Sequence, residues 1–215
     1  MATRPVFVSI LKPPFYRVQN VDFDWNKGLN INQQRKNVVA VHEVFCRAFP
    51  DKKVLEISTK SLQPEGLPLS AFKLQKYVPS LDRTICVENL YQGGKVFRNG
   101  GPYTEIYDAV YKKGKKDDRL HTSGPIVGFY FEGVTYPVRH FEAGYNWLYI
   151  NALLENPELS EPLLSYDAFT DISFNPQRMT SCQAKSAAIF VALSRLGKLD
   201  EVADFDSFVR LVYGR

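Results

Sequence analysis

The sequence has few of the residues that would cross-link the chain or hold it in a membrane. Its three cysteines are scattered and form no Cys-x-x-Cys pair, so we expect no disulfide framework, and a reducing compartment fits. No window approaches the roughly 18 apolar residues that a membrane span needs. The first residues also lack the apolar run of a signal peptide. We therefore expect a cytoplasmic protein without a membrane partner.

The motifs of several enzyme classes are also missing. There is no G-x-G-x-x-G after a strand, no H-E-x-x-H and no G-x-S-x-G. The segment Gln92-Gly93-Gly94-Lys95 lacks the first glycine and the following Ser or Thr of a phosphate-binding loop. The three histidines, His42, His121 and His140, share no ligand spacing with a cysteine, so we expect no zinc site, no other metal and no cofactor. Carboxylates, amides and a lysine remain, and these suit cleavage of a glycosidic or acyl bond.

The composition is that of a folded protein with a substantial core. The 215 residues are 45% hydrophobic and 13% aromatic, which excludes disorder and indicates a single domain. The net charge is 27 − 23 = +4, which permits a polyanionic partner such as nucleic acid but does not require one. The densest basic run, residues 112–116, is typical of a solvated loop or a helix end. A contact with a phosphate backbone is the alternative.

The spacing of apolar residues predicts a mixed α+β fold with a small sheet, richer in helices toward the C-terminus. Residues 126–131 and 134–138 flank Glu132-Gly133 and predict a β-hairpin. A polar loop is expected after Pro13-Pro14, and a turn at residues 99–102. Further strands are predicted at 5–11, 54–58 and 84–87, and helices at 32–48, 88–97, 141–155, 181–196 and 205–213.

The segment of residues 87–97 is the strongest candidate for chemistry. On a helix that turns by about 100° per residue, Glu88, Gln92 and Lys95 share one face. Gly93 and Gly94 would each cost about 1 kcal/mol in a helix relative to alanine. That cost suggests that a neighbouring element or a ligand approaches the backbone closely. The geometry alone fits both a solvated amphipathic face with a Glu–Lys pair and a catalytic cleft.

The same residues resemble the signature of the NADAR (YbiA-like) family. In that family a Ser-containing loop precedes a helix that carries Glu, Gln and Lys. Here the loop is Leu69-Ser70-Ala71-Phe72, and Glu88, Gln92 and Lys95 match the helix residues. Downstream, Asn146-Trp147 and residues 152–159 look like a second motif of the family. The similarity covers about residues 55–197, which implies a NADAR-like catalytic domain over 55–215 and an N-terminal extension, residues 1–54, packed on it.

Departures from the family pattern point to a subgroup. Ala71 replaces the asparagine of the loop, Asn89 replaces a histidine, and Gly94 replaces a glutamine. Residues 167–176 stand where typical members have a stretch rich in tryptophan and glycine. This variant resembles the NADAR antitoxins that accompany DarT-type DNA ADP-ribosyltransferase toxins, which modify guanine.

The resemblance implies a hydrolase that removes ADP-ribose from guanine in DNA, acting as an antitoxin. Its partners would be ADP-ribosylated DNA or ADP-ribose, with the cognate toxin as a further candidate. The implied catalytic residues are Glu88, Lys95 and Asp171. The implied substrate-binding residues are Ser70, Phe72, Gln92, Tyr103, Trp147 and Asn175.

Several roles stay open at this point. Glu88 would activate water or a ribose hydroxyl, or stabilise positive charge on the ribose. Lys95 would either hold a phosphate or attack the ring-opened aldehyde as a Schiff-base nucleophile. Asn175 competes with Asp171 for the second acidic position, and Trp147 either stacks on the base or belongs to the core. Two other functions also fit: an N-glycosidase for a small metabolite such as a riboflavin-pathway intermediate, or a non-catalytic antitoxin that binds ADP-ribose or the toxin.

Overall fold

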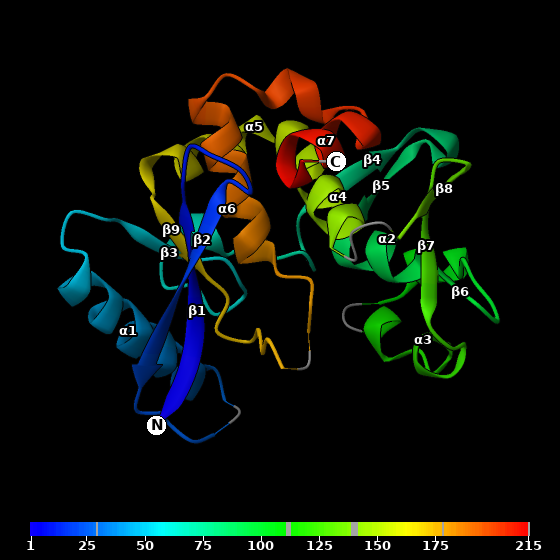
Figure 1. Cartoon of the computed structure of the whole chain (residues 1–215). Helices are drawn as coiled ribbons and strands as arrows, with labels where there is room; N and C mark the ends of the chain where they lie inside the picture. Colours follow the sequence, from blue (N-terminus) through cyan, green and yellow to red (C-terminus); the bar gives the residue numbers. More distant parts are fainter. Residues whose placement is uncertain (29, 111–112, 139–141, 178, 215) are drawn as a thin grey trace. The chain divides into compact units, whose positions relative to one another are not determined.

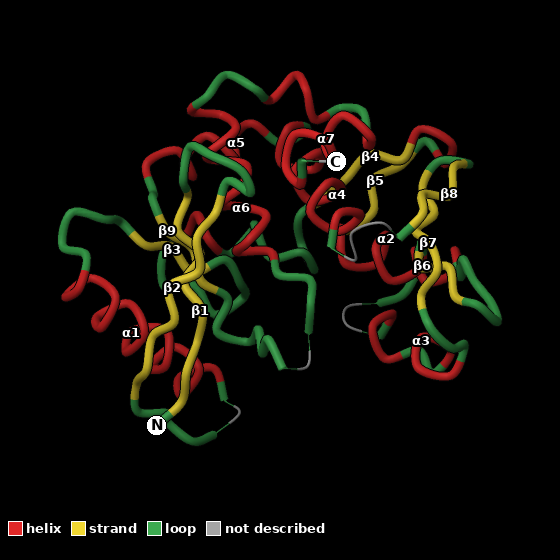
Figure 2. Tube along the Cα trace, in the orientation of Figure 1, coloured by secondary structure: helices red, strands yellow, loops and turns green. Residues whose placement is uncertain are grey.

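The computed structural model describes residues 1–28, 30–110, 113–138, 142–177 and 179–214, and divides into two compact units. Unit 1 comprises residues 1–70 and 157–215, and unit 2 comprises residues 71–156. Both contain helices and strands, which confirms the predicted α+β class (Figures 1 and 2). The predicted boundary after residue 54 falls inside the strand β3 (Val54–Glu56), and that division stays a prediction.

Unit 1 is built on a four-stranded sheet with the order β2-β1-β9-β3. The strand β1 (Ala2–Ser9) pairs antiparallel with β2 (Tyr16–Phe23) and with β9 (Ala168–Thr170), and β9 pairs in parallel with β3. The helices of this unit are α1 (Ile31–Ala48), α5 (Pro157–Ser160), α6 (Gln183–Arg195) and α7 (Phe205–Tyr213). Short 3-10 turns lie at Pro64–Gly66, Glu161–Ser165 and Leu199–Val202.

The helices of unit 1 confirm the apolar periodicity of the sequence. The start of α1 is fixed by Asn30, whose Oδ1 accepts a hydrogen bond of 2.9 Å from the backbone N–H of Gln33. The helix ends at Ala48, two residues before Pro50. Phe45 and Val41 on its inner face pack into a core with residues of β1, β2 and β9. In the described part of the chain, no helix is long and apolar enough to cross a lipid bilayer.

The strand β2 corrects the prediction of a polar loop after Pro13-Pro14. All eight of its residues pair with β1, from Tyr16 opposite Ser9 to Phe23 opposite Ala2. Only Val21 and Phe23 of this strand are buried, so the apolar signal is weak. As the edge of the sheet, β2 is held mainly by backbone hydrogen bonds to one neighbour and needs few apolar side chains.

Unit 2 contains two small antiparallel sheets. One consists of β4 (Gln75–Val78) and β5 (Arg83–Cys86), and the other has the order β6-β7-β8. The strands β7 (Ile126–Phe131) and β8 (Val134–Pro137) confirm the predicted hairpin. The remaining elements are α2 (Val87–Gly93), β6 (Lys95–Phe97), α3 (Arg119–Thr122), α4 (Ala143–Leu154) and 3-10 turns at Pro79–Leu81, Thr104–Asp108 and Gly114–Lys116. Phe141, in the predicted helix 141–155, lies outside the described residues.

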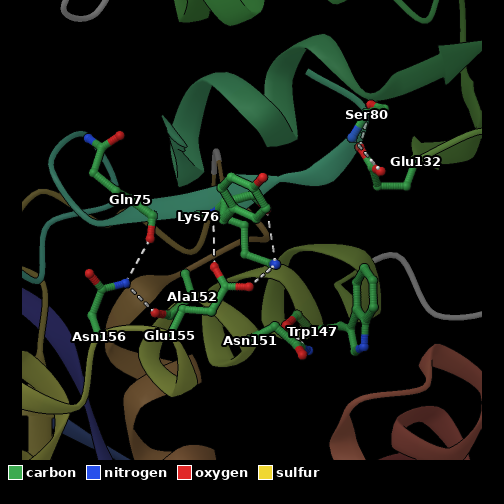
Figure 3. A network of polar contacts seen from close by, with 10 residues as sticks. Gln75, Lys76, Ser80, Glu132, Trp147, Asn151, Ala152, Glu155 and Asn156 are labelled. Atoms are coloured by element: carbon green, nitrogen blue, oxygen red, sulfur yellow. Dashed lines mark hydrogen bonds and ion pairs between the residues drawn. The ribbon is translucent and has the colours of Figure 1, made fainter. Parts of the chain in front are cut away.

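The C-terminal end of α4 is attached to β4 by polar contacts that Figure 3 shows. Glu155 pairs with the ammonium group of Lys76 and also accepts a hydrogen bond of 2.8 Å from the backbone N–H of Tyr77. The amide of Asn156 donates to the carbonyl oxygens of Gln75, at 2.9 Å, and Ala152, at 2.7 Å. These contacts pair backbone groups at the C-terminal end of α4 and backbone groups of β4 with the same two side chains. They therefore fix the position of α4 against the first sheet.

The predicted helix 88–97 is wrong at its C-terminal end. The helix α2 stops at Gly93, and Lys95 begins β6, which pairs with β7. A Cβ atom on Gly94 would lie 2.5 Å from the carbonyl oxygen of Tyr130, so only glycine lets the backbone approach β7 this closely. There the carbonyl oxygen of Gly94 accepts a hydrogen bond of 2.6 Å from the Tyr130 N–H. The close approach predicted from the two glycines is therefore confirmed, and it is made by a neighbouring strand.

We expect Gly94→Ala to destabilise the protein by about 1–3 kcal/mol, the usual cost of overpacking a tightly packed site. The added methyl group would meet the Tyr130 carbonyl and the Phe129 ring, and the backbone cannot move away without breaking the β6–β7 pairing. Thermal unfolding should show a Tm lowered by several degrees. Lys113→Ala changes an exposed residue and should leave Tm unchanged. An unaltered Tm for Gly94→Ala would contradict this account of the helix end.

Candidate active site

The helix α2 is held at its start by the loop that precedes β4. The N–H of Glu88 donates a hydrogen bond of 2.9 Å to the carbonyl oxygen of Ala71, and the N–H of Val87 donates one of 3.0 Å to that of Leu74. These are two of the N–H groups that a helix leaves unpaired at its N-terminus. The contacts therefore bring Glu88 next to the loop that carries Phe72.

The charged face of α2 is buried, which excludes the solvated amphipathic face. Glu88 is 5% exposed and Gln92 is 6% exposed. Every residue of the helix from Val87 to Gly93 is buried, so a carboxylate and an amide have been removed from water. Burial of such groups is unfavourable unless they are hydrogen-bonded, and buried charge of this kind is enriched at functional sites.

The three predicted residues Glu88, Gln92 and Lys95 lie together as one chain of hydrogen bonds. The Gln92 amide donates from Nε2 to Glu88 Oε1 at 2.9 Å, and its Oε1 accepts from Lys95 Nζ at 2.5 Å. Lys95 Nζ also lies 4.8 Å from the centre of the Tyr91 ring, a cation–π distance. Lys95 thus reaches its expected partner, although it belongs to β6 and not to the helix.

Lys115 joins this cluster and was not among the predicted site residues. Its Nζ lies 3.4 Å from Glu88 Oε1 and 5.9 Å from the centre of the Phe72 ring. It comes from the basic run that the sequence assigns to a solvated loop or helix end, and it lies in the 3-10 turn Gly114–Lys116. Lys112 of that run lies outside the described residues. The high density of lysines was the only sequence signal, and it does not distinguish Lys115 from its exposed neighbours.

The environment of Lys95 lowers the pKa of its amine. Burial lowers the pKa of Lys95 to about 8, the charge of Glu88 opposes this shift, and the charge of Lys115 adds to it. An amine with such a pKa is partly deprotonated just above neutral pH. It combines the proton affinity of a general base with the reactivity of a nucleophile.

Tyr103 packs against the end of α2. Its N–H donates a hydrogen bond of 2.8 Å to the carbonyl oxygen of Gly93, and its hydroxyl group shares one of 2.6 Å with the hydroxyl of Ser123. The guanidinium of Arg119 lies 4.3 Å from the centre of its ring. Tyr103 therefore borders the segment that connects Gln92 to Lys95, while its predicted contact with substrate stays a prediction.

Trp147 lies in an aromatic cluster of unit 2. It is 6% exposed, and its ring centre is 5.6 Å from that of Phe131 and 5.7 Å from that of Tyr136. These contacts are typical of a core tryptophan. Stacking of Trp147 on a nucleobase stays a prediction.

Phe72 lines a cavity of about 280 Å³ beside the start of α2. Cys86 and Asn89, which flank the position of Glu88 in the chain, line the same cavity. Its other lining residues are Gln75, Arg83, Thr84, Ile85, Tyr107 and Ala109. The cavity combines one charged side chain with polar and aromatic walls, a mixture suited to a polar aromatic ligand.

The other predicted residues belong to unit 1. Asp171 follows β9, and its Oδ2 accepts a hydrogen bond of 3.0 Å from the Gln183 side chain, while its Oδ1 accepts one of 3.0 Å from the N–H of Ser173. Asn175 lies in the same loop, where its Oδ1 accepts from the N–H of Gln177 at 3.0 Å. Ser70 is buried. Since both lie in one loop, the choice between Asp171 and Asn175 stays open.

The histidines, cysteines and carboxylates of the described residues are the remaining candidates for metal ligands. There, no group of three or more His, Cys, Asp or Glu side chains is arranged to hold a metal ion. His42 is used within unit 1, where its Nε2 lies 2.8 Å from the hydroxyl of Thr170. His140 lies outside the described residues.

A protein-family model described as NADAR-DarT1, DarT1-associated NADAR antitoxin, matches residues 2–215. The match includes the N-terminal segment and confirms the resemblance at the level of the subgroup. A comparison with curated proteins finds no match.

Two substitutions should move the pKa of Lys95 in opposite directions. Glu88→Gln removes a charge that raises it, so the pKa should fall further, and Lys115→Met removes a charge that lowers it, so the pKa should rise. The pH dependence of Lys95 labelling by an amine-reactive reagent, followed by peptide mass spectrometry, measures both. Near neutral pH we expect labelling to change by about two- to tenfold in each case, since one pKa unit is a factor of ten.

Lys116→Met is the matched control, because Lys116 lies in the same turn but is exposed. It should leave the labelling profile of Lys95 unchanged. Shifts in the same direction for Glu88→Gln and Lys115→Met would refute the arrangement of charges described above.

Proposed function

The chain belongs to the family of DarT1-associated NADAR antitoxins, and from this membership we propose that it is an N-glycosidase that removes ADP-ribose from guanine in DNA. It would thereby reverse the modification made by an ADP-ribosyltransferase toxin. The observation that carries the proposal is the buried chain Glu88–Gln92–Lys95, in which Lys95 has a lowered pKa. A carboxylate held beside an amine that is partly deprotonated just above neutral pH suits cleavage of a glycosidic nitrogen bond.

In the direct route, water attacks the anomeric carbon while the bond to the guanine nitrogen breaks. Glu88 takes a proton from water and passes it to the leaving guanine nitrogen, so the carboxylate is regenerated and free ADP-ribose is released. Positive charge builds up on the ribose during this step, and a nearby carboxylate stabilises it. The hydrogen bond from Gln92 holds Glu88 Oε1 in place for this role.

In the covalent route, the neutral amine of Lys95 bonds to the anomeric carbon as the bond to guanine breaks, and a proton released by the amine goes to the guanine nitrogen. The ribose ring then opens, and its oxygen takes a proton from solvent. The result is a protonated imine between Lys95 and the ribose, and water then hydrolyses it to ADP-ribose and the free amine. We favour this role of Lys95 over phosphate binding. Burial disfavours the charged ammonium form that would bind a phosphate, and it favours the neutral form that attacks carbon.

The surrounding residues are assigned to binding. Phe72 and Lys115 lie beside Glu88, where an aromatic ring and a cation suit a nucleotide and its phosphates. Asp171, with Asn175 as the alternative, would orient the ribose hydroxyls, and Ser70, Tyr103 and Trp147 complete the proposed substrate contacts. The net charge of +4 is compatible with DNA as the substrate.

The proposal is tested by turnover of an ADP-ribosylated guanine oligonucleotide. Glu88→Gln and Lys95→Ala should each lower kcat by about 10²- to 10⁴-fold, the range expected for loss of a catalytic acid, base or nucleophile. Lys116→Ala should keep wild-type activity, because that side chain is exposed. Undiminished turnover in both site variants would refute the assignment. Release of a base from small nucleotide glycosides, without activity on DNA, would support the metabolite glycosidase instead.

The covalent route makes a separate prediction. Turnover in the presence of cyanoborohydride should reduce the imine and leave ADP-ribose attached to Lys95, which mass spectrometry detects as a modified peptide. The adduct should form faster as the pH rises through about 8, since the amine loses its proton there. Lys95→Arg should form no adduct. Turnover without any adduct would exclude the imine and leave the direct route.

Protection of cells distinguishes hydrolysis from binding. Glu88→Gln should fail to protect cells from the toxin if hydrolysis is the antitoxin activity. A folded Glu88→Gln protein that still protects would favour the non-catalytic antitoxin, which binds ADP-ribose or the toxin directly.

A further inference from the structure

The loop after β9, which carries Asp171, is held by a clamp on a single residue, Ile172. The N–H of Ile172 donates to both oxygens of Glu56, at 2.9 and 3.2 Å. The carbonyl oxygen of Ile172 accepts a hydrogen bond of 3.2 Å from Arg4 Nε. Glu56 comes from β3 and Arg4 from β1, so two strands of the unit 1 sheet fix the residue that follows Asp171.

The Glu56 carboxylate is the centre of this clamp. It is 0% exposed and accepts two further hydrogen bonds of 2.6 Å, from the hydroxyl groups of Ser58 and Thr170. Each donor has to point at the Glu56 carboxylate, so this one buried group fixes the orientation of the hydroxyl groups of Ser58 and Thr170 and of the Ile172 N–H.

His42 extends the network and fixes its own tautomer. When Glu56 is ionised, the single hydroxyl proton of Thr170 points to Glu56, so the 2.8 Å contact between Thr170 and His42 requires a proton on His42 Nε2. Burial lowers the pKa of His42 to about 4, so the ring stays neutral over the physiological range. The hydrogen bonds therefore run in one direction, from His42 through Thr170 to Glu56.

Asp171 itself is held from a second side. The amide of Gln183, the first residue of α6, donates to Asp171 Oδ2 at 3.0 Å, and the following N–H of Ser173 donates to Oδ1 at 3.0 Å. Glu56 therefore holds the backbone of the residue after Asp171, while Gln183 and the Ser173 N–H hold its carboxylate.

We propose that Glu56 is a positioning residue for Asp171, acting together with Arg4 and His42 of the N-terminal segment. The proposal rests on the proposed function, in which Asp171 orients the ribose of the substrate. It gives the N-terminal 50 residues a role in the reaction: they supply Arg4, which holds Ile172, and His42, which fixes the donor that reaches Glu56.

The clamp should respond to pH. Burial, together with the neighbouring charge of Asp171, raises the pKa of Glu56 to about 7. The ionisable groups near the clamp include Arg4 and Cys182, which both interact electrostatically with Asp171, and His42, which is neutral. Burial raises the pKa of the Cys182 thiol well above its ordinary value. As the pH falls through about 7, Glu56 gains a proton and can no longer accept all of its hydrogen bonds, so the hold on Ile172 weakens.

The raised pKa of Glu56 also makes the stability of the fold depend on pH. The folded state binds the proton of Glu56 more tightly than the unfolded state, for which the ordinary value of 4.5 applies. The free energy of unfolding should therefore fall as the pH rises from 4.5 to about 7. Glu56→Gln should remove this part of the pH dependence.

The decisive experiment compares Glu56→Gln with wild type on the ADP-ribosylated guanine oligonucleotide across pH. We expect kcat to fall by about 10- to 100-fold with little change in KM, since a misplaced group loses orientation and not binding. The further decline of wild-type kcat that Glu56 adds below about pH 7 should vanish in the variant, while the dependence around pH 8 that comes from Lys95 should remain. Glu65→Gln is the matched control, a carboxylate of the same unit that accepts a hydrogen bond from Tyr166 outside the clamp, and it should behave as wild type.

Three outcomes are distinguishable. An inactive wild type would refute the proposed function itself. An active wild type with unchanged kcat and pH profile in Glu56→Gln would overturn the positioning role, as would full activity of Asp171→Asn. If Glu56→Gln does not fold, Arg4→Met removes the other half of the clamp, and it should lower kcat with KM unchanged. Wild-type kcat in that variant would also overturn the inference.

Discussion

The removal of Glu88 from water is the constraint on which the candidate site depends. A buried carboxylate costs several kcal/mol unless polar partners compensate it. Here the compensation comes from Gln92 on the same helix and Lys115 from a distant turn. The side-chain oxygen of Gln92 accepts a hydrogen bond from Lys95. The amide that stabilises the Glu88 carboxylate therefore also holds the Lys95 amine. The lowered pKa of Lys95 follows from the same burial. Stability and reactivity of the site thus have one physical origin.

Those parts of the fold with strong local signals were predictable from the sequence. The helix α1 has a capping Asn30, a regular apolar face and a proline after its end, and the β7–β8 hairpin has apolar runs around Glu132-Gly133. Both patterns depend only on residues that are close together in the sequence. The strands β2 and β9 lack such signals, because half of the residues of β2 are polar and β9 has three residues. Each exists through pairing with β1, a contact that spacing along the chain does not reveal.

The candidate site divides in the same way. Glu88 and Gln92 are one helical turn apart, so periodicity placed them together, and the structure agrees. Lys95 contacts the neighbour that helical spacing predicts but lies on a strand, because the glycines that are costly inside a helix end α2 at Gly93. Lys115 and Glu56 were missed. Each reaches its partner through tertiary packing, and a lysine in a basic run or a glutamate in a short strand carries no mark of that contact.

The sheet of unit 1 has a consequence for the order in which the chain becomes structured during synthesis. Its strands β1 and β3 are made early, but β9, which lies between them, comes more than a hundred residues later. Unit 2 is one continuous stretch, residues 71–156, whose strands pair with near neighbours in sequence. During synthesis, unit 2 would therefore leave the ribosome as a segment whose contacts are local. At that stage β1 and β3 would still lack β9, the strand that lies between them. The loop that carries Asp171 forms only when nearly the whole chain exists, so a partly made chain would hold Glu88 and Lys95 but not the ordered Asp171.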